Sequence, residues 1–183
     1  MEPSKVYFTD MRARPGTNLQ QKLEKLMRRA GFETIDFKDK YAAIKIHFGE
    51  PGNLSYLRPN FAKTVADMVK ALGGKPFLTD CNTLYVGRRK NALDHMDAAY
   101  ENGYSPFSTG CQIIIADGLN GTDEVAVPVK GRPYLPNALV GRAVMDADVC
   151  FALSTFQGPE FTGFGGPVKT GGLGCGARAG QRE

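Results

Sequence analysis

The fold is decided by residues 41–80, which read YAAIKIHFGEPGNLSYLRPNFAKTVADMVKALGGKPFLTD. Tyr41–Phe48 is a short run rich in apolar and aromatic residues, as expected for a β-strand. Apolar residues at helical spacing follow from Pro59, and Gly73 ends that helix before a second short strand at Lys75–Thr79. The segment therefore predicts a strand–helix–strand unit whose two strands lie parallel in one sheet.

The same alternation extends in both directions along the chain. The nearly continuous apolar run Cys111–Ala116 predicts a central strand covered on both faces. The fold class that follows is α/β, with an open, mainly parallel sheet and helices on both faces. The further expected elements are strands at Lys5–Thr9, Cys111–Ala116, Glu124–Val129 and Asp148–Leu153, and helices at Asn18–Ala30, Lys90–Asn102 (with Leu93, Met96 and Tyr100 inward) and Asn137–Ala147.

The composition changes after Ser154. Nine glycines fall among the 23 residues from Gly158 to Gly180, which predicts a glycine-rich C-terminal loop and excludes a regular helix or a central strand. We therefore expect an α/β domain over residues 1–157, and a glycine-rich loop with a truncated C-terminal segment of the same domain over residues 158–183.

Composition and charge narrow the classes of partner. The net charge of +4 is spread along the chain without a basic run, which argues against a nucleic-acid partner and fits a small anionic ligand. No stretch approaches the roughly 20 apolar residues of a membrane span. Met1–Asp10 lacks the apolar core of a signal peptide. We therefore expect a cytoplasmic protein with no membrane partner.

The four cysteines are too widely spaced for a clustered zinc or iron–sulfur motif, because no two lie within four residues of each other. Cys111 and Cys150 lie in apolar runs and are predicted to be reduced core residues. Cys175 lies in the polar, glycine-rich segment, which makes it the candidate for reactivity or metal ligation. An unreactive free thiol is the alternative for Cys175.

Polar side chains follow each predicted strand of the sheet. His47–Glu50, Asp80–Thr83, Asp117-Gly118 and Ser154-Thr155 each stand directly after a strand. Because right-handed crossovers bring the carboxyl ends of parallel strands to one edge, where ligands bind, these groups predict a common site. The alternative is that they only begin turns and cap helices.

A divalent metal is one candidate occupant of that edge. The predicted ligands are His47, Glu50, Asp80 and Cys175, and the imidazole and carboxylate groups among them suit a borderline or hard metal. His47 is also placed to carry a proton, or to be a hydrogen-bonded histidine near the core. His95 is expected at the surface of its helix.

A small anionic ligand is the other candidate occupant. The run from Gly163 to Gly176 offers unhindered backbone N–H groups that bind anions, with Lys169 as a countercharge. Arg88 stands in a cationic cluster before a helix start, which suits a phosphate or carboxylate, although a solvated surface is the alternative. The predicted ligand-binding residues are Asn82, Thr83, Arg88, Asp117, Gly165, Gly166 and Lys169.

Several separated strings of the chain together carry a family resemblance. They are Ala43–Glu50, Gly52-Asn53, Arg58-Pro59, Gly74–Asp80, Asn82–Tyr85, Gly87-Arg88, Asp117–Gly121 and Gly163–Gly166. In these strings the chain resembles the uncharacterised iron–sulfur-centre proteins, a prokaryotic family defined by a domain of unknown function. The resemblance runs from about Ser4 to Gly180.

The resemblance implies a cluster-associated protein with a redox role. Family members are typically longer and end in a ferredoxin-like portion whose clustered cysteines bind [4Fe-4S] centres, whereas this sequence ends at Glu183. We therefore expect the α/β module of such a protein, which binds a metal or a small anionic ligand at the strand ends, with the reaction left open.

The alternative is a non-catalytic binding or scaffold module for a ferredoxin-like domain or subunit. Two departures from the family pattern favour this second interpretation. Thr155–Pro159 stands where a string of the His-Phe-Lys-Gly-His type is expected, and Lys169-Thr170 stands where Lys-Asn is expected.

Overall fold

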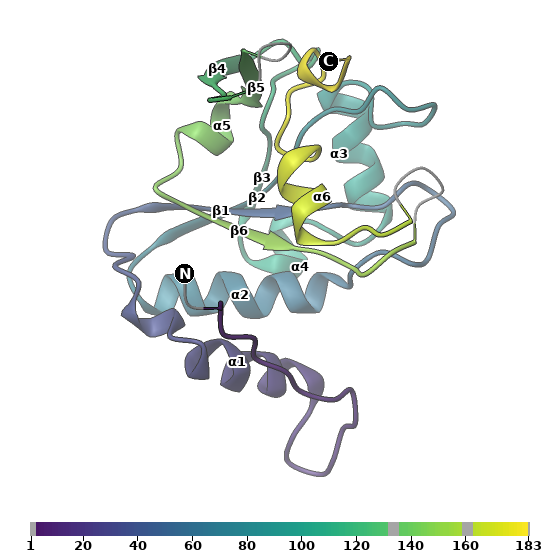
Figure 1. The fold of residues 1–183 in the computed structure, drawn as a ribbon. Coiled ribbons are helices and arrows are strands. Elements are labelled where there is room, and N and C mark those ends of the chain that lie inside the picture. The colour runs from purple at the N-terminus through teal and green to yellow at the C-terminus, as the bar shows by residue number, and fades with distance from the viewer. Residues whose placement is uncertain (1–2, 132–135, 159–162, 183) are drawn as a thin grey trace.

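A parallel four-stranded sheet forms the centre of the protein. The computed structural model describes residues 3–131, 136–158 and 163–182 (Figure 1). The strand order is β3-β2-β1-β6, and every neighbouring pair is parallel. The predicted α/β class with a mainly parallel sheet is confirmed. The strands are β1 (Tyr41–Ile46), β2 (Lys75–Asp80), β3 (Gln112–Ile115) and β6 (Val149–Leu153), and a second, antiparallel sheet pairs β4 (Glu124–Pro128) with β5 (Asn137–Gly141).

Helices flank the sheet. α2 (Pro59–Ala71) packs against β1 and β2, and α1 (Leu19–Arg29) lies along α2 (Figure 1). The Asn18 side chain caps α1 by accepting the N–H of Gln21, which is the signal that predicts this helix start. α6 (Pro167–Gly172) lies over β6 and β1 on the other face. The remaining helices are α3 (Ala92–Glu101), α4 (Pro106–Thr109), α5 (Arg142–Met145), and the 3₁₀ turns Phe32–Thr34 and Gly180–Arg182. None of the helices in the described part of the chain is both long and apolar enough to cross a bilayer.

The hydrophobic core lies between the sheet and α2. Ile44, Leu78 and Ile113 point from three neighbouring strands toward the buried Val65 and Val69 of α2. Each such side chain stabilises the fold by roughly 1.5–3 kcal/mol when it is fully buried. This layer fixes the strand register, and with it the positions of the strand ends.

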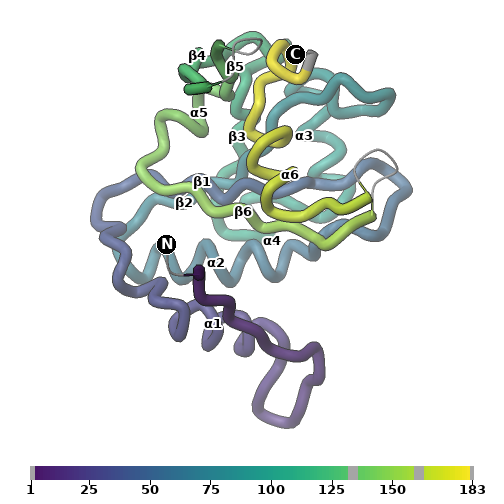
Figure 2. The backbone as a smooth tube through the Cα atoms, viewed as in Figure 1, coloured from purple at the N-terminus to yellow at the C-terminus, as the bar shows by residue number. Residues whose placement is uncertain are grey.

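The predicted strand at Lys5–Thr9 is wrong. These residues form no ladder, and Val6 and Phe8 are almost fully exposed. The segment that follows them is tied to α1 instead, because the Lys22 ammonium donates hydrogen bonds to the carbonyls of Asp10 and Arg12. Figure 2 shows this N-terminal part of the chain running beside α1. A strand-like run without access to a sheet edge has no backbone partner, so it stays irregular.

The predicted helix at Asn137–Ala147 is also wrong over its first half. Leu139 and Val140 pair with Ala126 and Val125 in the small antiparallel sheet, and only Arg142–Met145 is helical. Cross-strand pairing of apolar and β-branched residues overrides the weak helical spacing here.

Two predicted strands have the expected positions but different surroundings. The strand predicted at Cys111–Ala116 is β3, which lies at an edge of the sheet and leaves Gln112 and Ile114 exposed. β6 forms the opposite edge, so Cys150 is exposed and the prediction of a core cysteine is wrong, whereas Cys111 is buried as predicted.

Two expectations about helices also need correction. In α3 the predicted inward face is wrong for Leu93 and Tyr100, which are exposed, and right for Met96, which packs against the core. His95, expected at the surface, is fully buried. The glycine-rich segment contains the short helix α6, which begins with Pro167 in its first turn. Proline is favourable there because its missing N–H needs no partner in a first helical turn.

Candidate functional site

A pocket opens where β1, β2 and β6 end and the C-terminal segment crosses the sheet. Its volume is about 120 Å³, which is room for several waters or a small ligand group. The site therefore lies at the carboxyl edge of a parallel sheet, where open α/β folds bind ligands. The predicted site residues that line it are His47, Asp80, Thr83, Gly165, Gly166 and Lys169.

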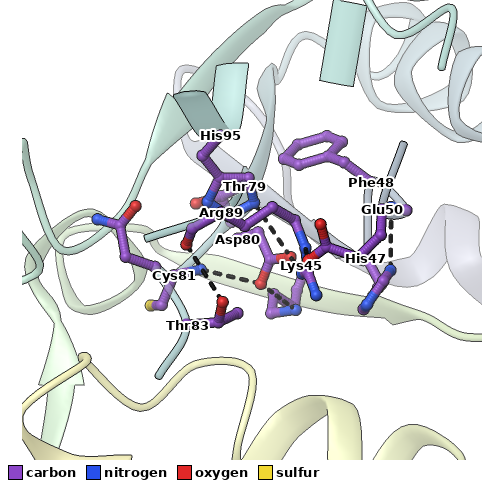
Figure 3. A network of polar contacts seen from close by, with 12 residues as sticks. Lys45, His47, Phe48, Glu50, Thr79, Asp80, Cys81, Thr83, Arg89 and His95 are labelled. Atoms are coloured by element: carbon purple, nitrogen blue, oxygen red, sulfur yellow. Dashed lines mark hydrogen bonds and ion pairs between the residues drawn. The ribbon is translucent and has the colours of Figure 1, made fainter. Parts of the chain in front are cut away.

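The floor of the pocket is a buried ionic network. The Lys45 ammonium lies 2.8 Å from the Asp80 carboxylate, and their side chains are only 2% and 4% exposed. The Arg89 guanidinium bridges the carboxylates of Glu50 and Asp80: its Nε lies 2.6 Å from Glu50 and its Nη1 lies 3.3 Å from Asp80. Figure 3 shows these side chains pointing toward one another. Charges removed from water at this depth are tolerated only when they are paired in this way.

The network keeps Asp80 ionised. Burial alone would raise the pKa of Asp80, but the Lys45 ammonium, His95 and the Arg89 guanidinium outweigh it and hold the pKa well below its ordinary value. His95 Nε2 lies 3.6 Å from the carboxylate, and its ring packs edge-on against Phe48. The Cys81 backbone N–H donates a further hydrogen bond of 2.9 Å to Asp80. Asp80 is therefore the centre of the network.

Gly174 covers Lys45 from above. A Cβ atom at this glycine would lie 2.5 Å from the Lys45 ammonium and 2.5 Å from the Thr170 carbonyl. Only a residue without a side chain lets the backbone approach the buried lysine this closely. Part of the glycine richness of this segment thus has a local physical reason.

His47 and Glu50 stand on the β1 side of the site. Part of the His47 side chain stays exposed. Removal of water from the rest of the ring, and after it the nearby Arg89 charge, lowers the pKa of His47 to about 4. Its Nδ1 accepts the Gly49 N–H at 3.0 Å, which only the neutral ring allows. Glu50 also accepts the Arg88 backbone N–H at 3.2 Å. His47 is therefore a neutral rim residue, and Glu50 orients Arg89.

The opposite wall comes from β6 and α6. Ser154 and Thr155 follow β6 and line the pocket together with Lys169. The Ser154 hydroxyl oxygen is buried and has no hydrogen-bond partner in the described part of the chain. No acidic side chain among the described residues lies within ion-pair distance of Lys169, which is half-buried. This wall offers unused donors to the cavity.

Asp117 and Asn82 do not line the pocket but hold its loops together. The buried Asp117 carboxylate accepts the backbone N–H of Asn82 at 2.9 Å and that of Arg178 at 3.0 Å. The Asn82 side-chain amide donates to Asp117 at 2.9 Å and to the Gly118 carbonyl at 2.9 Å. Burial raises the pKa of Asp117. Asn82 and Asp117 were predicted to bind the ligand, but in the structure they support the ends of β2 and β3.

Arg88 and Cys175 also lie outside the pocket lining. The Arg88 guanidinium is exposed and pairs with Glu101 of α3 at 2.6 Å, while its neighbour Arg89 points into the network. Cys175 follows Gly174, and its backbone carbonyl accepts the Gly141 N–H at 3.0 Å and the Cys81 thiol at 3.4 Å. The structure therefore brings six of the eleven predicted site residues to one cavity.

The residues of the site do not fit a resident divalent metal. Of the predicted ligands, Asp80 and Glu50 are held by Lys45 and Arg89, His47 uses Nδ1 as an acceptor, and Cys175 lies elsewhere. No group of three or more His, Cys, Asp or Glu side chains within residues 3–131, 136–158 and 163–182 is arranged to hold a metal ion. A metal bound at Asp80 would also face two cations. The four cysteines, all within the described residues, form no such group either.

Sequence reasoning missed three central residues of the network: Lys45, Arg89 and His95. Lys45 carried a usable signal, because a lysine inside an otherwise apolar strand must be exposed, paired or functional. Arg89 was recognised only as part of a cationic cluster. His95 gave no local signal, since its burial depends on how α3 packs against Phe48.

Comparison with known proteins gives one match. No curated protein and no solved structure matches the chain. A family model described as Domain of unknown function (DUF362) matches residues 42–183, a range that covers most of the chain and every residue lining the pocket. That description names no cofactor. On this match the chain belongs to the DUF362 family.

Proposed function

We propose that the pocket binds a small anionic ligand that carries a phosphate or carboxylate group. The observation that carries the proposal is the charge of the lining: among the described residues it contains three basic side chains, Lys45, Arg89 and Lys169, and one carboxylate, Asp80. Glu50 compensates Arg89 from just outside the lining. Lys169 is then the cation left for a ligand.

The neutral donors support the same ligand class. The buried Ser154 hydroxyl, which has no hydrogen-bond partner among the described residues, lines the same cavity as Gly165 and Gly166. A buried polar group without a partner costs about 1–3 kcal/mol, so a ligand oxygen that accepts from Ser154 would recover part of that free energy. Lys45 and Arg89 are paired with Asp80 and Glu50 in the floor, so these two cations are already balanced.

Calorimetric titration with inorganic phosphate and with citrate tests the proposal. Replacing Lys169 by glutamine removes a cation that has no acidic partner among the described residues, without disturbing the buried network. A charge-assisted hydrogen bond contributes about 1.5–3 kcal/mol, so we expect the affinity of Lys169→Gln for the preferred anion to fall about tenfold or more.

Lys63→Gln is the matched control, because Lys63 pairs with Asp67 on α2, far from the pocket lining. It removes the same charge and should leave the affinity unchanged. Equal binding by Lys169→Gln and Lys63→Gln would contradict the proposal, as would a wild-type protein that binds neither anion.

A protein partner at the rim is the second candidate. Large apolar side chains stand exposed beside the pocket, with Phe156 81% and Val168 87% exposed next to the lining residues Thr155 and Lys169. Exposed apolar groups gathered around a cavity favour a docking surface. The partner that the family resemblance predicts is a ferredoxin-like domain with a [4Fe-4S] centre. Protection of the Gly165 region from proteolysis by a purified ferredoxin would support this candidate.

A further inference from the structure

The floor of the pocket has hydrogen-bond donors that the protein does not use. The Lys45 ammonium lines the pocket and is only 2% exposed, and its ion-pair partner among the described residues is the Asp80 carboxylate. An ammonium carries three N–H donors, so at least one remains even if both oxygens of Asp80 accept from it. A buried donor without an acceptor is unfavourable. The pocket therefore suits a ligand with an oxygen atom next to Lys45.

Asp80 likewise has an acceptor position left. An ionised carboxylate can accept about four hydrogen bonds. Its Oδ1 lies 2.8 Å from Lys45 Nζ and accepts the Cys81 N–H at 2.9 Å, and its Oδ2 lies 3.3 Å from Arg89 Nη1. His95 Nε2 is 3.6 Å from Oδ2 and makes no hydrogen bond to it. The floor thus presents a donor from Lys45 and an acceptor from Asp80 side by side (Figure 3).

The floor lies close to the wall that carries Lys169. At the end of α6 the Gly174 N–H donates to the Lys169 carbonyl at 3.4 Å, and a Cβ at Gly174 would lie 2.5 Å from Lys45 Nζ. The backbone of Lys169 is therefore about one helical turn, roughly 5.4 Å, from the backbone that covers the buried ammonium. Ser154 stands two residues after Ala152, the register partner of Lys45. A ligand that contacts both the floor and this wall must be short.

We propose that the ligand is a short 2-hydroxycarboxylate, an inference that rests on the anion-binding function proposed above. Its carboxylate lies at Lys169 and Ser154. The hydroxyl on the adjacent carbon accepts a hydrogen bond from Lys45 and donates one to Asp80. A hydroxyl does both at once, whereas an oxo group only accepts, and an ammonium only donates and would face the Lys45 charge.

Charge and size favour the same class of ligand. Lys169 is the one cation of the described lining that no carboxylate balances, and a monocarboxylate supplies one negative charge. A phosphate monoester carries about −1.5 to −2 charges at pH 7, and the excess would lie beside the ionised Asp80. The volume of about 120 Å³ suits a molecule of this size, since a cavity of about 150 Å³ holds benzene.

Calorimetric titration with a matched series of three-carbon acids tests the inference. Lactate, pyruvate, alanine and propionate share the carboxylate and carry a hydroxyl, an oxo group, an ammonium or only hydrogen on the adjacent carbon. We expect the better-bound enantiomer of lactate to bind about tenfold or more tightly than the other three, because each of these lacks a hydrogen bond to a charged group. If phosphate or citrate binds but lactate binds no better than pyruvate or propionate, this inference fails and the anion site stands. If none of these anions binds, both fail.

Two variants separate the two ends of the ligand. Ser154→Ala removes a donor to the carboxylate, so it should weaken lactate and propionate by the same factor. Lys45→Met/Asp80→Leu removes both partners of the hydroxyl and keeps Lys169, so lactate and propionate should then bind equally. The comparison of acids in the wild type needs no variant, so misfolding of a mutant would not leave the question open. A preference for lactate that survives in the folded double variant would overturn the proposal.

Discussion

The two faces of the parallel sheet are made by neighbouring residues of the same strands, yet they are covered in different ways. On one face Ile44 and Leu78 pack against the 13-residue helix α2 and are fully buried. On the other face Lys45 lies beneath a glycine-rich segment whose only α-helix in its described part has six residues. A thick apolar cover leaves no space, whereas a thin cover with few side chains leaves a cavity above buried charges.

The difference separates stability from chemistry. The α2 face gains free energy from apolar burial, which is non-directional and tolerates substitutions of similar volume. The opposite face depends on paired charges whose positions are set by individual contacts, such as Lys45 with Asp80. Substitutions on the α2 face should therefore lower stability alone, whereas substitutions on the opposite face should also weaken anion binding, even where their cost in stability is similar.

The largest expected effect comes from Lys45→Met. Removing one partner of a buried ion pair typically costs about 3–5 kcal/mol, because the remaining charge is left uncompensated. Arg89 still pairs with Asp80 in this variant, so we expect a loss near the lower end of that range in urea unfolding. The double variant Lys45→Met/Asp80→Leu should be more stable than the single one, since it also removes the buried carboxylate that has lost its lysine partner.

Ile44→Val is the comparison on the α2 face. It should cost about 0.5–1.5 kcal/mol and leave anion affinity unchanged, because Ile44 points away from the pocket. If Lys45→Met cost no more than Ile44→Val, or if the double variant were less stable than Lys45→Met, the ionic network would not have the role assigned to it.

Gly174→Ala should have a smaller effect, confined to the thin cover. The added Cβ would lie 2.5 Å from the Thr170 carbonyl oxygen. Because that oxygen belongs to the backbone, the backbone itself would have to shift. Such overpacking typically costs about 1–3 kcal/mol, and the shift should also weaken anion binding. Gly171→Ala is the matched control, because a Cβ there meets nothing within 4 Å. Equal unfolding midpoints for the two variants would show that Gly174 is not required for the close approach.

Features of the two sheet faces that depend on residues close together in the sequence could be predicted, and those that depend on residues far apart in the sequence could not. The strand–helix–strand unit over 41–80 and the helix expected over Asn18–Ala30 are written in local periodicity, and both are confirmed. The convergence of His47 and Asp80 at one edge follows from parallel topology and short connections.

What was missed depends on packing between distant segments. The burial of Lys45 requires Gly174, far along the chain, to cover it, and no local pattern records that contact. The packing of α3 that buries His95 and exposes Leu93 reflects the fit against Phe48. Lys5–Thr9 has a strand pattern but forms no ladder, because a local pattern does not determine whether a segment comes to lie against a sheet edge.

The smallest expected effect concerns His47, which follows β1 at the rim of the pocket. Its pKa falls from 6.5 to about 4 in the folded protein, so between these pH values the unfolded chain binds a proton that the folded protein does not. The free energy of unfolding should therefore fall as the pH decreases from about 6.5 to 4. His47→Asn should lose less stability than the wild type over this range in urea unfolding.

The comparison isolates His47 because the other shifted carboxyls are common to both proteins. Asp80, with its lowered pKa, contributes stability that is lost only below its ordinary value of 3.8, and Asp117 affects wild type and variant alike. Because the His47 side chain is partly exposed, solvent screening should keep the difference small. Parallel loss of stability in the two proteins would mean that the ring is as free to protonate in the fold as in the unfolded chain, and that the Gly49 N–H contact to Nδ1 does not hold it neutral.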